Sequence, residues 1–175
     1  MPDSGVPIAV QSANNLMRTL PRSIAVIRKN DEQLKDLLSA TGIEIVENPD
    51  VNSGLSSSIR YGIEHLNRKT GTGGPLSGYL IALADMPFIS PETIKLLVDV
   101  LTQGHLICAP QFQNKRGHPV GFSAKLESEL LSLQGDIGAK TLIDKYSESL
   151  QIVPVTDEAV LRDVDSVDDL KIKSR

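Results

Sequence analysis

Six consecutive apolar residues, Tyr79 to Ala84, run without polar alternation and stop at a carboxylate, Asp85. An unbroken apolar run of this length is typical of a strand that is covered on both faces, usually in a parallel sheet. The chain then reaches Ser90-Pro91, which predicts a helix capped by Ser90 with Pro91 in its first position. Because open α/β sheets bind their ligands at the carboxyl ends of their strands, Asp85 is a candidate ligand-binding residue.

Apolar segments with strand-like and helix-like patterns alternate along the whole chain. We predict helices at 7–20, 31–40, 54–69, 91–103, 124–133, 139–146 and 167–172, and strands at 23–28, 43–46, 79–84, 106–109, 150–155 and 159–164. Residues 112–122 are interpreted as a hairpin-like excursion on the edge of the sheet. Alternation in units of about thirty residues predicts a three-layer α/β fold with a mostly parallel sheet. The 175 residues fit a single domain.

The charge and composition exclude several classes of protein. The chain carries 18 Lys+Arg against 22 Asp+Glu, without a basic cluster, which argues against nucleic-acid binding. Its apolar runs are too short to span a membrane, and its start lacks the apolar core of a signal peptide. The single Cys108 lies in an apolar run, as expected of a buried thiol in a reducing compartment. A soluble cytoplasmic protein is expected.

Two carboxylates, Asp85 and Asp165, occupy similar positions after apolar segments and before candidate helices. Either residue could cap a turn or pair with a nearby base, which needs no ligand. Alternatively, the two carboxylates converge on one edge of the sheet and hold a divalent cation such as Mg²⁺, whose preferred ligands are oxygens. The convergence favours the metal site. The three histidines show no metal-ligand spacing, so zinc is not expected.

Three further motifs are candidate binding segments. Gly54-Leu55-Ser56-Ser57-Ser58 opens a helix, where backbone amides and hydroxyls can bind an anion or a base edge, although ordinary capping by Ser56 explains the same pattern. Gly117-His118-Pro119 fixes the direction of an imidazole, or is a surface turn with an incidental histidine. Gly135-Asp136-Ile137-Gly138 predicts a helix capped by Asp136, and its glycines suggest a close backbone approach.

The motifs together resemble the MobA/MocA-like nucleotidyltransferases, and most closely the molybdenum cofactor cytidylyltransferase branch. The segments that carry the resemblance occur in order over nearly the whole chain: Asn48-Pro49 with Gly54 to Ser58, Leu83-Ala84-Asp85-Met86-Pro87, Gly117-His118-Pro119-Val120, Gly135-Asp136-Ile137-Gly138-Ala139 and Asp163-Val164-Asp165-Ser166. The resemblance implies one Rossmann-like nucleotidyltransferase domain over 1–175. It also implies Mg²⁺-dependent transfer of CMP from CTP, or GMP from GTP, to a pterin phosphate, molybdopterin, with release of pyrophosphate.

The resemblance also implies roles for individual residues. Asp85 and Asp165 match the metal-binding carboxylates of the family. The segment Gly54, Leu55, Ser56, Ser57 and Ser58 would lie beside the base and sugar of the nucleotide. The acceptor would face a third set of residues: Gly117, His118, Pro119, Gly135, Asp136 and Gly138.

The start of the chain departs from the family pattern. Family members begin with a strand and a Leu-Ala-Ala-Gly loop with Arg, Gly and Lys that wraps the triphosphate, whereas Met1 to Ile8 resembles the segment after that loop. Losing one oxyanion donor can cost about 10²–10³ in rate, so losing the loop should nearly abolish transfer. Three expectations stay open: a start upstream of Met1, another segment or chain that fills the gap, or a protein that does not catalyse transfer.

Two alternatives to the transferase follow from this departure. One is a non-catalytic molybdopterin-binding or assembly protein, and the other is a transferase that acts on a different phosphorylated acceptor. Strand edges left without a neighbour also favour a homodimer.

Overall fold

The computed structural model describes residues 5–50, 54–68 and 75–164. Its helices are α1 (Ile8–Met17), α2 (Glu32–Ser39), α3 (Gly54–Arg68), α4 (Pro91–Thr102), α5 (Glu127–Leu131) and α6 (Lys140–Lys145). Its strands are β1 (Ile24–Arg28), β2 (Glu44–Asn48), β3 (Gly78–Ile81), β4 (Ile107–Phe112), β5 (Lys115–Arg116), β6 (Val120–Ser123) and β7 (Leu150–Pro154), and short 3₁₀ helices lie at η3 (Ala124–Leu126), η4 (Ser147–Ser149) and η5 (Glu158–Leu161). The predicted helix at 167–172 lies outside the described residues.

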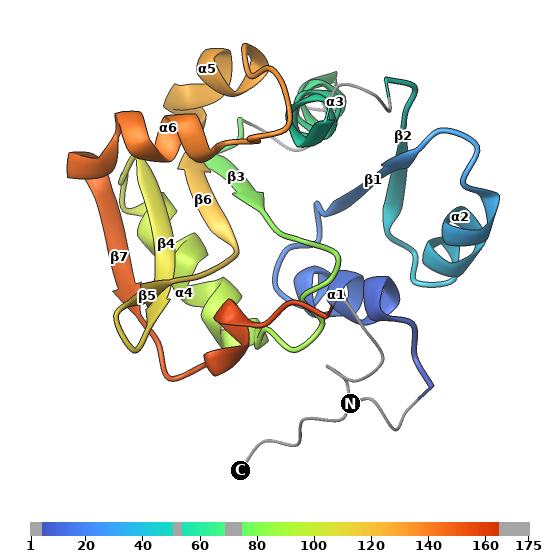
Figure 1. The fold of residues 1–175 in the computed structure, drawn as a ribbon, viewed down its shortest axis with the longest axis horizontal. Coiled ribbons are helices and arrows are strands. Elements are labelled where there is room, and N and C mark those ends of the chain that lie inside the picture. The colour runs from blue at the N-terminus through green and yellow to red at the C-terminus, as the bar shows by residue number, and fades with distance from the viewer. Residues whose placement is uncertain (1–4, 51–53, 69–74, 165–175) are drawn as a thin grey trace.

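Among the described residues, the strands form two sheets that no strand pairing joins (Figure 1). In the smaller sheet, β1 and β2 run parallel. In the larger one, the order is β3-β6-β4-β7, and the short β5 pairs with the end of β4 on the same side as β6. Strands β3 and β4 are both antiparallel to β6, so they run in the same direction as each other, and β7 runs parallel to β4. The mixed α/β class is confirmed.

Two details of the predicted sheet are wrong. The sheet is not mostly parallel, because β6 runs antiparallel between β3 and β4. Residues 112–122 therefore do not form an edge excursion: the β4–β5 turn leads into β6, which is completely buried at the centre of the sheet. The turn itself is a hairpin, as predicted, with Gln113 and Asn114 at φ 48° and 63°.

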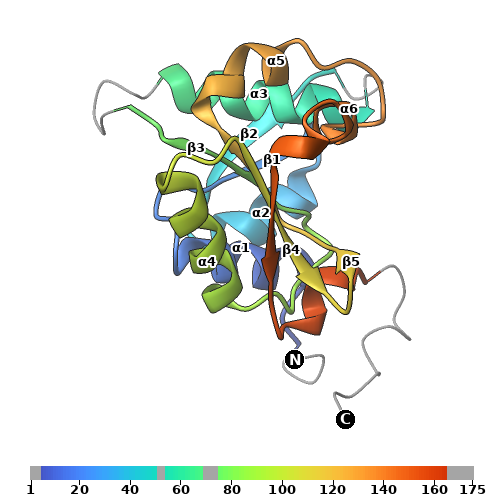
Figure 2. The same cartoon turned by 90° about the vertical axis from the view of Figure 1, so that its left-hand side faces the viewer.

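The helices cover both faces of the larger sheet (Figure 2). In that view α3 and α5 lie together at the top, and α1 and α4 lie below them. A large apolar core under α3, α5 and α6 includes Ile63, Ile107 and Phe122. On the opposite side, α4 packs through Ile94 and Leu97. Helices on both faces of a sheet make the three-layer arrangement that the sequence predicts.

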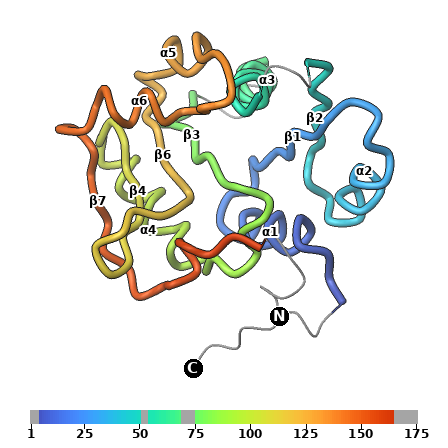
Figure 3. Tube along the Cα trace, in the orientation of Figure 1, coloured from blue at the N-terminus to red at the C-terminus, as the bar shows by residue number. Residues whose placement is uncertain are grey.

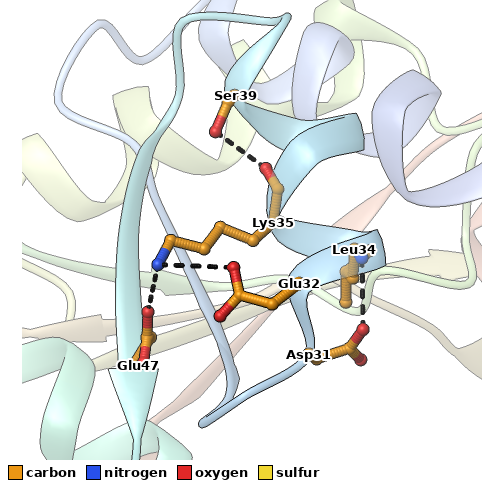
Figure 4. A network of polar contacts seen from close by, with 6 residues as sticks. All are labelled: Asp31, Glu32, Leu34, Lys35, Ser39 and Glu47. Atoms are coloured by element: carbon orange, nitrogen blue, oxygen red, sulfur yellow. Dashed lines mark hydrogen bonds and ion pairs between the residues drawn. The ribbon is translucent and has the colours of Figure 1, made fainter.

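Local sequence signals determine where several helices begin. Ser90 Oγ accepts a hydrogen bond from Thr93 N, and Pro91 is the first residue of α4, as predicted. In α2, Asp31 Oδ1 accepts from Leu34 N at 3.1 Å (Figure 4). Lys35 of the same helix reaches Glu47 of β2 at 2.6 Å, and this hydrogen bond raises the pKa of Lys35. The half-exposed pair ties α2 to the smaller sheet, and such pairs contribute little stability.

Two predicted strands differ in the structure. The apolar run at 79–84 forms strand only to Ile81, so three further residues separate β3 from Asp85. The predicted strand at 159–164 is instead the 3₁₀ helix η5 followed by an extended segment. The carboxylate of Asp157 caps η5 through Ala159 N at 3.1 Å, and its other oxygen accepts from Ser90 N and Thr93 Oγ1. These contacts with α4 favour a turn where the apolar pattern indicates a strand.

A large cavity of about 740 Å³ separates the two sheets. Strands β1 and β3 face it from opposite sides, and residues of α1 and α3 line it from the two helical layers. The space is partly open to the surface, so it is a cleft between the two sheets rather than a sealed void, and most of the residues that line it are apolar.

Candidate functional site

Asp85 lies on a loop that α1 fixes in place. Ser12 Oγ of α1 donates to Ala84 O at 2.8 Å, and Asn15 Nδ2 donates to Pro87 O at 2.8 Å and Ile89 O at 3.1 Å. Both Ser12 and Asn15 are buried, so these hydrogen bonds form away from bulk water. Within the described residues, Asp85 Oδ1 is buried and has no hydrogen-bond partner. Burying a carboxylate oxygen without a partner is costly, which points to a ligand at this position.

His118 lies near Asp85 and also has a buried polar atom without a hydrogen-bond partner among the described residues. Its Nδ1 atom is buried, and no described residue forms a hydrogen bond with it. Burial lowers the pKa of His118 below its usual range, the Arg116 cation lowers it further, and the Asp85 carboxylate acts in the opposite direction. The imidazole is therefore neutral at pH 7, and a neutral imidazole can accept a hydrogen bond or bind a metal.

One segment after β7 fixes Asp85 and His118 in place relative to each other. His118 N donates to Val160 O at 2.9 Å, and Val164 N donates to Asp85 O at 2.9 Å. Figure 3 shows this segment, in red, returning beside the green loop that follows β3. Gly117 is required here, because a side chain at this position would collide with the backbone carbonyl of Val160. The Gly-His-Pro motif is thus part of the packing around Asp85.

The segment 54–58 forms the first turn of α3, as predicted. Asn48 at the end of β2 donates through Nδ2 to Ser57 Oγ at 2.8 Å and to Ser58 Oγ at 3.2 Å. Ser57 Oγ donates in turn to Gly54 O at 2.8 Å. Ser56 is fully buried, and its hydroxyl has no partner among the described residues, so it is not an ordinary helix cap. Leu55, by contrast, is 44% exposed.

The loop 135–138 packs against the start of α3. Ser56 N donates to Gly135 O at 3.3 Å, and Gly54 leaves no room for a side chain because Asp136 lies against it. Asp136 does not cap α6 as predicted: the residue before α6 is Ala139, which makes no side-chain cap. The carboxylate of Asp136 instead lies at the positive end of the α3 dipole, where a negative charge is stabilised.

The structure therefore arranges the predicted residues in two groups. The first group contains Asp85 with Gly117, His118 and Pro119, and the second contains the 54–58 segment with the 135–138 loop. No described hydrogen bond joins the two groups. Asp165 lies outside the described residues. Within the parts of the chain that are described, no cluster of three or more His, Cys, Asp or Glu side chains could hold a metal ion.

Two residues of interest received no predicted role, although Asn48 belongs to one of the segments that carry the family resemblance. Asn48 is 3% exposed and positions two of the serines of α3. Its position just after the predicted strand, ahead of the 54–58 segment, could have indicated this role. Arg60 follows Ser56 by one helical turn, and its Nε atom is buried without a described partner. The sequence offers no comparable signal for Arg60, because exposed arginines are common in helices.

Comparison with known proteins identifies the family. The family model of the MobA-like NTP transferase domain matches residues 1–150. The chain belongs to this family. No curated protein shows a significant match to this MobA-like chain. Among the described residues of this family member, no helix is both long and apolar enough to cross a membrane.

Solved structures share the fold of this MobA-like domain. Rv0371c of Mycobacterium tuberculosis, in a complex with manganese, is 23% identical, with a TM-score of 0.76 over 94% of this chain and 84% of its own. A nucleotidyl transferase from Methanothermobacter is 17% identical, with a TM-score of 0.71 over 95% and 78% of the two chains. Molybdopterin-guanine dinucleotide biosynthesis protein A from Archaeoglobus fulgidus is 16% identical, with a TM-score of 0.54 over 89% and 80%. At these identities the likeness establishes a nucleotidyltransferase fold.

Proposed function

We propose that this protein is a single-domain nucleotidyltransferase over residues 1–175 that transfers a nucleotide from an NTP to a phosphorylated acceptor. Membership of the MobA-like family supports the reaction class. The observation that carries the proposal is the Asp85 Oδ1 atom on the loop after β3, which is buried without a partner among the described residues. A divalent cation is the ligand that such an oxygen suits.

The residues near Asp85 supply part of the ligand set that a divalent cation needs. Asp85 would hold the cation together with Asp165, and the neutral imidazole of His118 lies near Asp85. When bound, the cation neutralises the charge that develops on the transferring phosphate and on the pyrophosphate leaving group. Mg²⁺ is the cation that the resemblance implies. The manganese in the Rv0371c complex supports a test of Mn²⁺ as well.

The residues of this chain position the two substrates. The serines at the start of α3, fixed by Asn48, would bind the base and sugar of the nucleotide. His118 and the 135–138 loop would face the acceptor. Catalysis then depends on positioning and on charge neutralisation, with no protein nucleophile. The partly buried Arg60 would add a positive charge beside the nucleotide segment.

We further propose that the reaction is transfer of CMP or GMP to molybdopterin, in a cytoplasmic protein. The ordered motifs and the likeness to the Archaeoglobus protein support this assignment. A second candidate, binding of molybdopterin without transfer, is favoured by the cavity between the sheets. Leu55 and Ser58 of the proposed nucleotide segment line this cavity, so an open space lies where the nucleotide would otherwise be held.

Release of pyrophosphate tests the proposal. The purified protein is incubated with each NTP, with Mg²⁺ or Mn²⁺, and with molybdopterin. We expect release with CTP or GTP, and a loss of about 10²-fold or more in the Asp85→Asn variant because the cation is lost. Asp99→Asn, which changes an exposed carboxylate on α4, is the matched control and should keep full activity. If no NTP yields pyrophosphate while molybdopterin still binds, the protein is the non-catalytic alternative.

A further inference from the structure

Residues 157–164 form a return segment that lies against the loop after β3 (Figure 3). Val164 N donates a hydrogen bond to Asp85 O at 2.9 Å, and Asp157 Oδ2 accepts one from Ser90 N at 2.9 Å. The contacts occur in opposite order along the two segments, so the return segment runs antiparallel to the loop. It thereby holds the loop at two points, one of them Asp85 itself.

Between these two points, the side chain of Arg162 lies over the ring of Phe88. The guanidinium carbon of Arg162 is 4.6 Å from the centroid of the Phe88 ring, a distance at which a cation is attracted to an aromatic face. Both residues are half-buried, so water screens this attraction only in part. Along both segments the contact falls between the two hydrogen bonds, and it therefore belongs to the same antiparallel register.

The contact between Arg162 and Phe88 specifies that register. A backbone hydrogen bond such as the one from Val164 to Asp85 is not selective, since every residue except proline offers a similar N–H and C=O. Phe88 is the one aromatic residue of the loop, so a cation over its ring selects a single alignment. Arg162 lies only two residues before Val164, whereas Asp157 contacts the far end of the loop.

The register determines where the Asp85 carboxylate lies. No hydrogen bond from a described residue holds Asp85 Oδ1, so its position depends on the backbone that carries it. Asp165, the second carboxylate of the proposed cation site, follows Val164 in the sequence. A shift of two residues between extended segments moves one past the other by about 7 Å. Groups that bind a metal must be held within about 0.5 Å of their working geometry.

We propose that Arg162 is a positioning residue for the cation site at Asp85, because its contact with Phe88 sets the register of the return segment on the loop. This inference rests on the proposed function, since it assigns a role within that cation site. Arg162 acts through Phe88 and not through its charge. A positive charge near a divalent cation repels it, so the direct effect of the charge on cation binding has the opposite sign.

Two measurements on the full chain separate positioning from charge. Arg162→Met and Phe88→Leu each remove the contact, and Arg162→Lys keeps a cation that can lie over the ring. Lys95→Met removes an exposed positive charge on α4 and is the matched control. The first measurement is hydrogen exchange of the Val164 amide in the absence of metal. The second is the affinity for Mn²⁺, measured by electron paramagnetic resonance with CTP and with GTP.

We expect Arg162→Met and Phe88→Leu to speed exchange of the Val164 amide and to weaken Mn²⁺ binding, each by about two- to fivefold, the factor that an ordinary cation–π contact supplies. The double variant should change no more than the more affected single variant, because both substitutions remove the same contact. Arg162→Lys should recover most of the Mn²⁺ affinity. Lys95→Met should match the wild type in both measurements.

Three results would overturn the positioning role. Unchanged exchange in Arg162→Met would show that the contact does not set the register. Faster exchange with unchanged Mn²⁺ affinity would make Arg162 purely structural, and tighter Mn²⁺ binding would reveal an effect of charge alone. A wild type that binds no Mn²⁺ with either nucleotide gives a distinct result: the proposed function itself fails, and the role of Arg162 in it fails too. Unchanged exchange in the amides of α4 shows that each variant is folded.

Discussion

Burial in the fold suppresses the ionisation of the Cys108 thiol. It is 0% exposed, and its Sγ atom packs where a side chain at Gly121 would otherwise lie. Burial raises the pKa of Cys108 to about 11, from 9.0. The neutral thiol of the folded state thus stabilises the protein fully below about pH 9, and this contribution is lost as the pH rises towards 11.

We expect the free energy of unfolding to fall more steeply with pH in the wild type than in Cys108→Ala. Between pH 8 and pH 10, the wild type should lose about 1 kcal/mol more unfolding free energy than the variant, because only its unfolded state gains a thiolate. Urea unfolding at the two pH values measures the difference. Equal losses in the two proteins would show that burial of the thiol does not affect its ionisation.

The sequence predicted the positions of some important residues, but not their surroundings in the fold. Asp85, Ser90 and Asp31 were found because their signals are local: a carboxylate after an apolar run, and caps before helices. The lack of a hydrogen-bond partner for Asp85 Oδ1 and His118 Nδ1 within the described parts of the chain was not predictable, because it depends on which atoms surround each group in the folded chain. Their roles as ligands stay predictions.

At the scale of elements, the contact between α3 and the 135–138 loop connects two predicted motifs that lie about eighty residues apart in the sequence. Gly54 and Gly135 both adopt positive φ, at 67° and 76°. A side chain at Gly54 would collide with the Asp136 carboxylate and lie 2.7 Å from the Asp136 Cα atom, whereas none would meet any atom at Gly135 within 4 Å. A comparison of the same substitution at the two glycines therefore isolates the effect of the contact between α3 and the loop.

We expect Gly54→Ala to destabilise the protein more than Gly135→Ala. Both variants suffer the backbone strain of a left-handed conformation, about 1–2 kcal/mol. Only Gly54→Ala also has to move backbone atoms of the loop, which adds about 1–3 kcal/mol. Chemical unfolding of the two variants at pH 7 measures the difference. If both variants lose the same stability, the loop does not pack on α3.

The elements themselves were predicted well where the hydrophobic pattern was long and periodic, as in α1, α3 and α4. The segment 159–164 was predicted as a strand because it is apolar, but Asp157 bonds to Ser90 and Thr93 and fixes a turn there. The direction of β6 was also missed. Pairing partners determine strand direction, and a single sequence does not contain them.

At the scale of the whole molecule, the described residues form two sheets on either side of a large cavity that α1 and α3 also line. The sequence alone did not predict this cavity, because it depends on how far apart the two sheets lie in the folded chain.

The central claim is that Asp85 holds a divalent cation on a nucleotide. Calorimetric titration of CTP and GTP, with and without Mg²⁺, into the wild type, Asp85→Asn and Asp99→Asn tests it most directly. We predict that the wild type and Asp99→Asn bind one of the nucleotides only when Mg²⁺ is present, and that Asp85→Asn does not bind it. Binding that is equally strong without Mg²⁺, or that is unchanged in Asp85→Asn, would contradict the account.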